Sequence, residues 1–506
     1  MASITPMRPG GDASTPTTDT AVPMNTLKRR ALFLGSANAF DYAVQFLLPV
    51  VLARTLNAEA FGEYRLLWLV VMSIMAVAPL AMPQSLYYFL PRADAQTRRL
   101  YVHQTIIYLA CAGIISAWVL SQWNPLQPAS MNSFSQYGFL VPSLVALWVA
   151  SCLLDILPTI EERVFWQAGI TISLSLLRAI TLAVAAWITG DLRVLIWLLT
   201  GFALLKLLLL VLYIGRMQGL AGPWLQRKTF VEQFRHAAPF GFSGALYGLR
   251  GQADQWVALS LFSLTSFAAF SIAAVLGPLV NLFRLSVNHV FLPSMSKLQA
   301  AGDVFGMLDL NSRANVMVAA LLYPFLAFAF VFAEELISVV YTATYLEAAP
   351  AMRVYIVSLA ALVVELASIT LLLREGAFAF RLNILVLTGS IAVSWFAAQY
   401  YGLAGAAAGS VLAIYVDRLA TLQRIGRRTG ISLGQLQNWR VLAQLLLFSA
   451  LAGGLAWVLT MHSLHLTGLL ARLVFGGAVL AAAYGAMLML CGIGRGWLVA
   501  ALHLKG

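Results

Sequence analysis

The sequence predicts an all-α polytopic membrane protein with about 14 transmembrane helices. Of its 506 residues, 61% are hydrophobic and only 10% are charged, and the mean hydropathy is +0.83. Soluble domains carry about 25% charged residues, because a soluble chain of this size must cover a large surface with polar groups. Lipid must therefore solvate most of this chain, which excludes a cytosolic enzyme, a secreted domain and a nucleic-acid-binding protein.

Apolar segments follow one another along the chain after a polar beginning. Residues 1–27 are rich in Pro, Thr, Ser and Gly and predict a disordered tail. A spanning helix needs about 20 mostly apolar residues. We expect such spans at residues 31–53, 62–84, 101–121, 138–158, 166–188, 192–214, 238–260, 268–292, 315–337, 353–373, 382–400, 403–422, 441–460 and 470–491.

The basic residues fall mostly on one side of this arrangement. With the N-terminus in the cytoplasm, cytoplasmic segments hold most of the 32 Lys and Arg residues, as the positive-inside rule requires. We therefore expect both termini in the cytoplasm and attribute the net charge of +12 to topology and to contact with anionic headgroups. The opposite side holds Arg54, Arg65, Arg193, Arg353 and Arg472.

The motifs of soluble enzyme chemistry are missing from the sequence. Cys111, Cys152 and Cys491 lie far apart in apolar segments, which predicts neither a disulfide framework nor a zinc site. There is no Gly-rich phosphate loop with a Lys, no zinc-protease helix and no nucleophile elbow. We expect no cofactor, no bound metal and no enzymatic activity.

Polar side chains occur at membrane depth, where an ionisable group costs about 2.5–3.5 kcal/mol and is a candidate for function. Helical spacing places them on shared faces, which we expect to turn inward around a water-filled cavity or toward one another. These faces are Asn38, Asp41, Tyr42 and Gln45 in the first span, Thr171, Ser175 and Arg178 in the fifth, Tyr247, Arg250 and Asp254 in the seventh, and Asn281, Arg284 and Asn288 in the eighth.

Structural explanations compete with these functional ones. Arg250 and Asp254 are four residues apart and could pair to stabilise the bundle. Lys206 stands alone in a Leu-rich segment, where we expect it to extend toward the membrane surface or to mark a misplaced span edge. We also favour a structural role for Glu365, and cavity-lining roles for Asp41, Arg250 and Arg284.

Several short segments resemble one known family. In their order and spacing they are similar to the polysaccharide and lipopolysaccharide biosynthesis flippases of the multidrug/oligosaccharidyl-lipid/polysaccharide exporter superfamily. The resemblance covers most of residues 30–375, although Ala269 and Phe270 replace the Gly and Tyr usual there. The segments are Leu52 to Arg54, Leu56 and Phe61 to Tyr64, then Pro239, Gly241 and Asp254, then Phe267 to Leu276 and Leu292 to Ser296, and finally Glu335 to Ile337, Tyr345 and Ala348.

This resemblance implies a fold of two six-helix bundles related by a pseudo-two-fold axis, with two further helices at the C-terminus. We expect the bundles at residues 28–215 and 216–430 and the additional helices at 431–506. An internal repeat agrees with this symmetry, because Phe61 and Tyr64 recur as Phe267 and Phe270 at the start of the second and eighth spans.

The resemblance also implies a transporter that works by alternating access. Its substrate would be a lipid-linked oligosaccharide, flipped from the cytoplasmic to the outer leaflet of a bacterial inner membrane to build cell-surface polysaccharide or lipopolysaccharide. Expected partners are this substrate, membrane lipids and, in the same process, polymerase and export proteins.

Transport of such a lipid needs a polar cavity with cations, because its diphosphate cannot cross hydrocarbon unaided. Arg is preferred for its fork of donors. We expect Arg250, Arg284 and Arg178 to bind the diphosphate. Carboxylates would hold these arginines or carry coupling ions, and neutral polar groups would bind sugar. The carboxylates are Asp41, Asp254 and Glu365, and the neutral groups are Tyr247, Asn281, Asn288, Asn38 and Gln45.

Two other functions stay open. A drug or cation antiporter of the same superfamily would favour a cavity dominated by carboxylates. A membrane scaffold that does not transport would have no need for costly buried charge. A glycosyltransferase or ligase would need a long loop outside the membrane to hold its site, and the expected loops are short.

Overall fold

The computed structural model describes residues 24–121, 134–219, 221–463 and 468–491. Within these ranges the chain is helical and contains no strand, so the predicted all-α class is confirmed. Residues 1–23 of the expected tail lie outside the described residues. Residues 24–27 begin the first helix, α1 (Met24–Thr55), rather than ending a tail. Met, Leu, Lys and Arg, which make up most of Met24 to Arg30, favour a helix and extend it ahead of the apolar segment.

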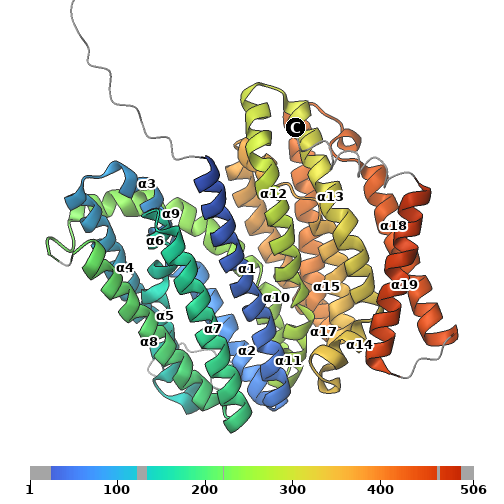
Figure 1. The fold of residues 1–506 in the computed structure, drawn as a ribbon, viewed down its shortest axis with the longest axis horizontal. Coiled ribbons are helices and arrows are strands. Elements are labelled where there is room, and N and C mark those ends of the chain that lie inside the picture. The colour runs from blue at the N-terminus through green and yellow to red at the C-terminus, as the bar shows by residue number, and fades with distance from the viewer. Residues whose placement is uncertain (1–23, 122–133, 220, 464–467, 492–506) are drawn as a thin grey trace, which may run out of the picture.

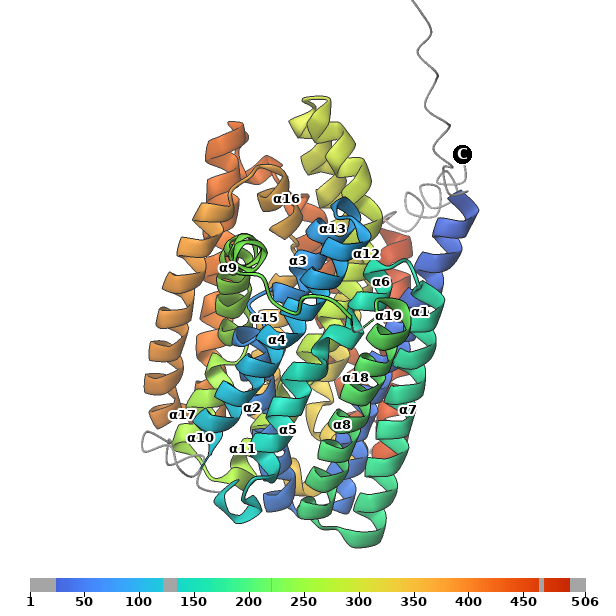
Figure 2. The same ribbon diagram turned by 90° about the vertical axis from the view of Figure 1, so that its left-hand side faces the viewer.

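The helices gather into two lobes, shown in blue to green and in yellow to orange in Figure 1. In the first lobe α1 packs along α7, and α4, α5 and α8 lie side by side on the face seen in Figure 2. Asn57 and Asp94 are the N-cap residues of α2 and α4, and their side chains accept hydrogen bonds from backbone N–H groups in the first turn of each helix. The other helices of this lobe are α2 (Ala58–Val77), α3 (Met82–Phe89), α4 (Ala95–Leu120), α5 (Leu140–Ser151), α6 (Leu157–Ile160), α7 (Val164–Thr189) and α8 (Leu192–Met217).

The second lobe is followed by a pair of helices on its outer side. These are α18 (Trp439–Val458) and α19 (Leu469–Leu490), which pack on α13 and α14 at the right of Figure 1. The lobe consists of α10 (Ala253–Leu261), α11 (Leu264–Ala273), α12 (Leu276–Ala300), α13 (Val304–Val331), α14 (Ala333–Val340), α15 (Ala348–Leu362), α16 (Ala367–Leu372) and α17 (Gly376–Thr429).

The described residues contain 11 helical segments long and apolar enough to cross a membrane. One of them, α17, has 54 residues and a non-helical Gly402 with φ of 58°, which Gly adopts without strain. The chain reverses there, since Ser394 donates a hydrogen bond of 2.7 Å to the carbonyl of Ala406. The expected spans 382–400 and 403–422 are the two arms of α17, while the expected seventh and tenth spans are too polar or too short to be counted. The total of fourteen stays a prediction.

Large apolar side chains face outward, as lipid solvation requires. Trp187, Val474 and Leu490 are 79%, 72% and 87% exposed. Contiguous apolar surface of this kind is rare on soluble monomers. The chain is therefore a multi-pass membrane protein by surface as well as by composition.

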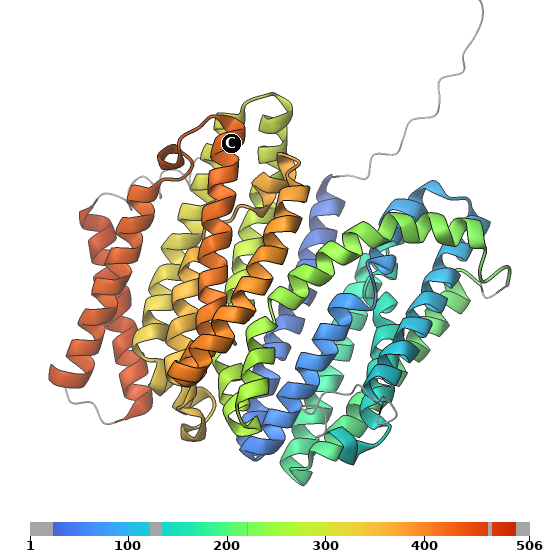
Figure 3. The same ribbon diagram turned by 180° about the vertical axis from the view of Figure 1, so that it is seen from behind.

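Helix α9 (Arg227–Arg250) joins the two lobes. In Figure 3 it is the green helix that slants from the first lobe toward the second. Its first half packs on α3 and α4, where Gln233 donates to Ser85 (2.8 Å) and Thr105 (2.9 Å), and α9 also contacts α17 in the second lobe. The expected boundary at residue 216 stays a prediction, and α9, which follows it, packs on both sides.

The lobes meet where α2 and α11 begin. Gly62 in α2 approaches the backbone of α11 so closely that a Cβ there would lie 2.2 Å from the carbonyl oxygen of Leu264. Phe61 packs edge-on against Tyr345, with ring centroids 5.6 Å apart, and Arg54 donates a hydrogen bond of 2.9 Å to the carbonyl of Val340. We call this region, formed by Arg54 to Gly62, Leu264 and Val339 to Tyr345, the closed end.

Candidate functional site

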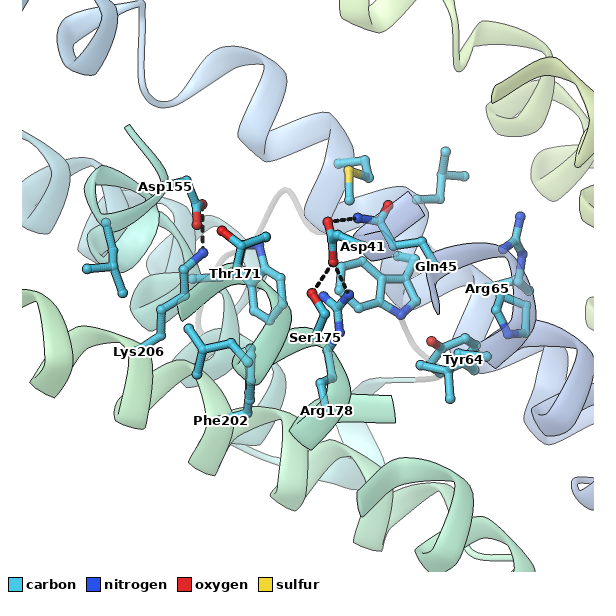
Figure 4. Close-up of a pocket in the computed structure, with 18 of the residues that line it drawn as sticks. Asp41, Gln45, Tyr64, Arg65, Asp155, Thr171, Ser175, Arg178, Phe202 and Lys206 are labelled. Atoms are coloured by element: carbon cyan, nitrogen blue, oxygen red, sulfur yellow. Dashed lines mark hydrogen bonds and ion pairs between the residues drawn. The ribbon is translucent and has the colours of Figure 1, made fainter. Parts of the chain in front are cut away.

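A cavity of about 440 Å³ lies inside the first lobe and reaches its contact with the second. Its wall comes from α1, α2, α5, α7 and α8, with two glutamines from the α9–α10 junction. Polar and ionised side chains point into it (Figure 4). The ionised ones are Asp41, Arg65, Asp155, Arg178 and Lys206, and the amides are Gln45, Gln167, Gln252 and Gln255.

The polar faces of α1 and α7 meet at Asp41. Its carboxylate accepts hydrogen bonds from Gln45 (2.6 Å) and from the hydroxyl of Ser175, and forms an ion pair with Arg178 at 3.4 Å. These residues lie on the faces that helical spacing indicates, and α1 and α7 pack along their length. The inward orientation expected for the first and fifth spans is therefore present for these residues. It is wrong for Asn38 and Tyr42 in α1, which are exposed and do not line the cavity.

A second ion pair crosses the cavity wall between α8 and the short helix that follows α5. Lys206 donates to Asp155 at 2.7 Å and lies 5.6 Å from the ring centre of Trp148. The expectation that Lys206 extends to the membrane surface is wrong, because a carboxylate lies within reach inside the lobe. Asp155 was not among the expected residues, although it lies inside the expected fourth span.

Arg65 is a cation that the sequence did not predict for the cavity. We expected it outside the membrane, but it lies in the second turn of α2 and lines the cavity wall. Its guanidinium donates to the backbone carbonyl of Ser271 at 3.3 Å, and it has no carboxylate partner within the described part of the chain. The cavity thus holds three cations and two carboxylates, with the excess positive charge at Arg65.

Aromatic rings line the same cavity as the amides. Trp68 and Trp148 pack edge-to-face with centroids 5.1 Å apart, and Tyr64 and Phe202 extend the same wall. Gln167 is 4% exposed and its carbonyl oxygen has no hydrogen-bond partner. Aromatic faces and unpaired amide groups are the features with which a protein binds the apolar face and the hydroxyls of a polar ring compound.

The polar residues expected from the seventh and eighth spans lie in a separate cluster in the second lobe. Arg250 donates to Asn383 (2.6 Å) and pairs with Asp417 at 3.1 Å, rather than with Asp254. The proposed pair fails because α9 ends at Arg250 and α10 begins at Ala253, which interrupts the i, i+4 geometry. Tyr247 is 63% exposed and does not share the buried environment of Asp254.

Three further sets of buried polar contacts lie in the second lobe. Arg284 forms an ion pair with Glu365 and donates to Asn281 at 3.0 Å. Asn288 donates to Ser368 at 2.6 Å, and Asp254 accepts from Tyr355 and, at 2.5 Å, from Ser410. None of these side chains lines the cavity of the first lobe, so the four polar faces do not surround one chamber. Asp417 went unpredicted, although its charge inside the expected twelfth span is a signal for it.

Comparisons with known proteins agree with this fold. A family model described as "Polysaccharide biosynthesis protein" matches residues 27–299. No curated protein matches the sequence. In structure the chain is similar to lipid II flippase MurJ in an inward closed conformation, with a TM-score of 0.66 and 14% identity over 90% of this chain and 99% of that one.

Two MATE transporters share the fold as well. The MATE multidrug transporter DinF-BH has a TM-score of 0.55 and 12% identity over 82% of this chain and 98% of its own. A mutant of the Vibrio cholerae MATE transporter VcmN has a TM-score of 0.54 and 12% identity over 81% and 98%. At such identities these likenesses show a common fold.

Proposed function

Because the chain belongs to the polysaccharide biosynthesis protein family, we propose that it flips a lipid-linked oligosaccharide from the cytoplasmic to the outer leaflet of a bacterial inner membrane. The family and fold are those of membrane flippases and transporters. Both termini would lie in the cytoplasm, and the product would feed the assembly of cell-surface polysaccharide or lipopolysaccharide by polymerase and export proteins.

The chemistry of the cavity in the first lobe is the observation that carries this proposal. Arg65 keeps an uncompensated positive charge, which suits a diphosphate. Gln45, Gln167 and Gln252 suit sugar hydroxyls, and Trp68 and Trp148 suit the apolar faces of sugar rings. A headgroup that combines diphosphate with glycan needs all three kinds of contact.

The arginines of the second lobe take a different place in this mechanism. Arg250 and Arg284 are each held by a carboxylate, so they would bind a diphosphate only after that ion pair opens. In the present arrangement Arg65, which has no carboxylate partner in the described part of the chain, is the better candidate for the first contact. Arg178 lines the same cavity but is paired with Asp41, so it would join after that pair opens. Asp254 and Glu365 keep their proposed role as structural or ion-coupling carboxylates.

A drug or cation antiporter is the second candidate, because two MATE transporters, one of them described as a multidrug transporter, share the fold. Such a cavity would be expected to carry excess negative charge, whereas this one carries excess positive charge. A scaffold is less consistent still, because it would not need five ionised groups around a cavity.

Flipping in proteoliposomes tests the proposal. We expect Arg65→Gln to lower the rate for a fluorescent polyprenyl-diphosphate oligosaccharide at least about tenfold, since a hydrogen bond to a charged group is worth about 1.5–3 kcal/mol. Arg313→Gln, which removes one charge at a residue whose side chain is 74% exposed, should leave the rate unchanged. Arg250→Ala and Arg284→Ala, compared at equal insertion, measure the contribution of the second lobe.

Two results would count against this function. Full flipping by Arg65→Gln and by Arg178→Gln would remove the role of the cavity as anion site. Transport of an organic cation with no effect of the diphosphate lipid would favour the antiporter. In cells, deletion of the gene should cause lipid-linked repeat units to accumulate on the cytoplasmic leaflet.

A further inference from the structure

A second, smaller cavity lies at the end of the first lobe where α4 and α7 begin and α8 ends. It has a volume of about 240 Å³ and shares no lining residue with the cavity described above. We call it the basic end pocket. Its polar lining consists of Arg98 and Arg99 from α4, Glu161 and Arg163 from the turn between α6 and α7, and Gln218 from the end of α8.

The charges of the basic end pocket are unbalanced. Its single carboxylate, Glu161, accepts hydrogen bonds from the hydroxyl of Tyr213 and from the amide of Gln218. None of the three arginines has an ion-pair partner among the residues that the structure describes. Glu161 therefore serves to hold α8 against the turn, and the pocket keeps a positive charge.

One of these arginines has an unused donor inside the protein. The Nε atom of Arg98 is buried and has no hydrogen-bond partner. A buried N–H group without an acceptor is costly, so binding of a ligand that supplies an acceptor is favoured.

The position of the pocket indicates where that anion comes from. Its residues lie at the ends of the candidate membrane spans Ala95–Leu120, Val164–Thr189 and Leu192–Met217. At this level the abundant anions are the phosphate groups of lipids, and arginine binds phosphate with two parallel hydrogen bonds.

We propose that the basic end pocket binds a phosphate-bearing group at the membrane surface, through Arg98, Arg99 and Arg163. Two sources have this chemistry, namely the headgroup of an anionic phospholipid and the diphosphate of a lipid-linked glycan. The proposal does not depend on what the larger cavity transports.

Ligand-induced stabilisation tests it. Full-length protein in phosphatidylcholine nanodiscs is titrated with inorganic pyrophosphate, and separately the fraction of phosphatidylglycerol is raised, while thermal unfolding is followed. We expect saturable stabilisation of the wild type. The double variant Arg98→Gln/Arg163→Gln should need at least about tenfold more ligand for the same stabilisation. If the double variant is not stable, the same titration is made with Arg163→Gln alone. Arg381→Gln/Arg427→Gln removes two exposed charges elsewhere and should behave as wild type.

The outcomes separate the sources and the two cavities. An effect confined to phosphatidylglycerol identifies a lipid headgroup site, and one confined to pyrophosphate identifies a diphosphate site. Equal titrations of the pocket and control double variants would overturn the proposal. It would also fall if Arg65→Gln/Arg178→Gln abolished binding while Arg98→Gln/Arg163→Gln did not, since the ligand would then occupy the larger cavity.

Discussion

At the scale of single residues, several charges inside this membrane protein are tolerated because a specific partner of opposite charge lies on another helix, while Arg65 has only a backbone carbonyl. Lys206 with Asp155, Arg178 with Asp41 and Arg284 with Glu365 are three such pairs. Helical spacing predicted polar residues that share a face on α1 and on α7, but it failed where the helix breaks between Arg250 and Asp254. It was not sufficient to predict partners, because a partner on another helix depends on packing that spacing does not encode.

The pair of Lys206 and Asp155 gives a prediction about stability. Asp155→Ala leaves Lys206 charged without a partner, and Lys206 is 7% exposed, so we expect a loss of about 1–3 kcal/mol, reduced by the partial exposure of Asp155. Lys206→Met in the same chain removes the unpaired charge and should recover most of the loss. Thermal unfolding in detergent measures both. A double variant no more stable than Asp155→Ala would show that the pair does not act through charge.

Glu375, which precedes α17, gives a prediction about pH. Hydrogen bonds from Arg424 (2.9 Å) and from Arg428 hold the pKa of Glu375 below its usual value of 4.5. A carboxylate whose pKa is lower in the folded state stabilises the fold above its unfolded pKa, and this contribution is lost as pH falls through the folded value. Below about pH 4.5 the wild type should therefore lose thermal stability more steeply than Glu375→Gln. Parallel curves for the two proteins would contradict this.

At the scale of elements, helix α2 and helix α11 begin in the same way and pack against each other. Asn57 accepts from the N–H of Ala60 at 2.7 Å, and Ser263 accepts from the N–H of Ser266 at 3.2 Å, so the two helices begin with the same kind of cap. Phe61 and Phe267 follow each cap at the same distance and are fully buried. The internal repeat thus corresponds to two equivalent helix starts at the interface between the lobes, which the resemblance implied and the residues alone only suggested.

Gly62 at this contact gives a prediction about helix packing. A methyl group at Gly62 would lie 2.2 Å from a backbone oxygen of Leu264, whereas one at Gly201 in α8 would meet nothing within 4 Å. Gly62→Ala should force the two helices apart and lower the unfolding temperature by several degrees, as overpacking costs about 1–3 kcal/mol. Gly201→Ala should be neutral or slightly stabilising, since Ala favours a helix. Equal stability of both variants would mean that the contact between α2 and α11 accommodates the added methyl group without loss of stability.

At the scale of the whole molecule, the lobes are joined by contacts at the closed end and by α9. The architecture was predictable, because apolar segment length and the placement of basic residues follow from bilayer thickness and charge. The separation of the polar faces into a cavity in one lobe and a cluster in the other was not predictable. The helix breaks between Arg250 and Ala253, so residues that the sequence places on one helical face lie on two helices. Arg65 escaped prediction because an arginine near a span edge has the same sequence signal as one outside the membrane.

If the lobes rock against each other during transport, the closed end must open. Arg54 donates to the carbonyls of Val339 and Val340 across the interface, so Arg54→Cys and Val340→Cys place two thiols on opposite lobes at this end. In a chain in which Cys111, Cys152 and Cys491 are replaced by Ala, a short reducible crosslinker between these thiols should stop flipping in proteoliposomes. Cleavage of the crosslinker should restore it.

The control for this experiment lies at the same end of the molecule. Arg353 and Glu334 form an ion pair of 3.1 Å within the second lobe, so crosslinked Arg353→Cys/Glu334→Cys carries the same chemistry without joining the lobes. It should flip substrate at the uncrosslinked rate, because relative motion of the lobes leaves distances within a lobe unchanged. Undiminished flipping with Arg54→Cys and Val340→Cys linked would exclude opening of the closed end, and with it any mechanism that exposes the cavity to the two leaflets in turn.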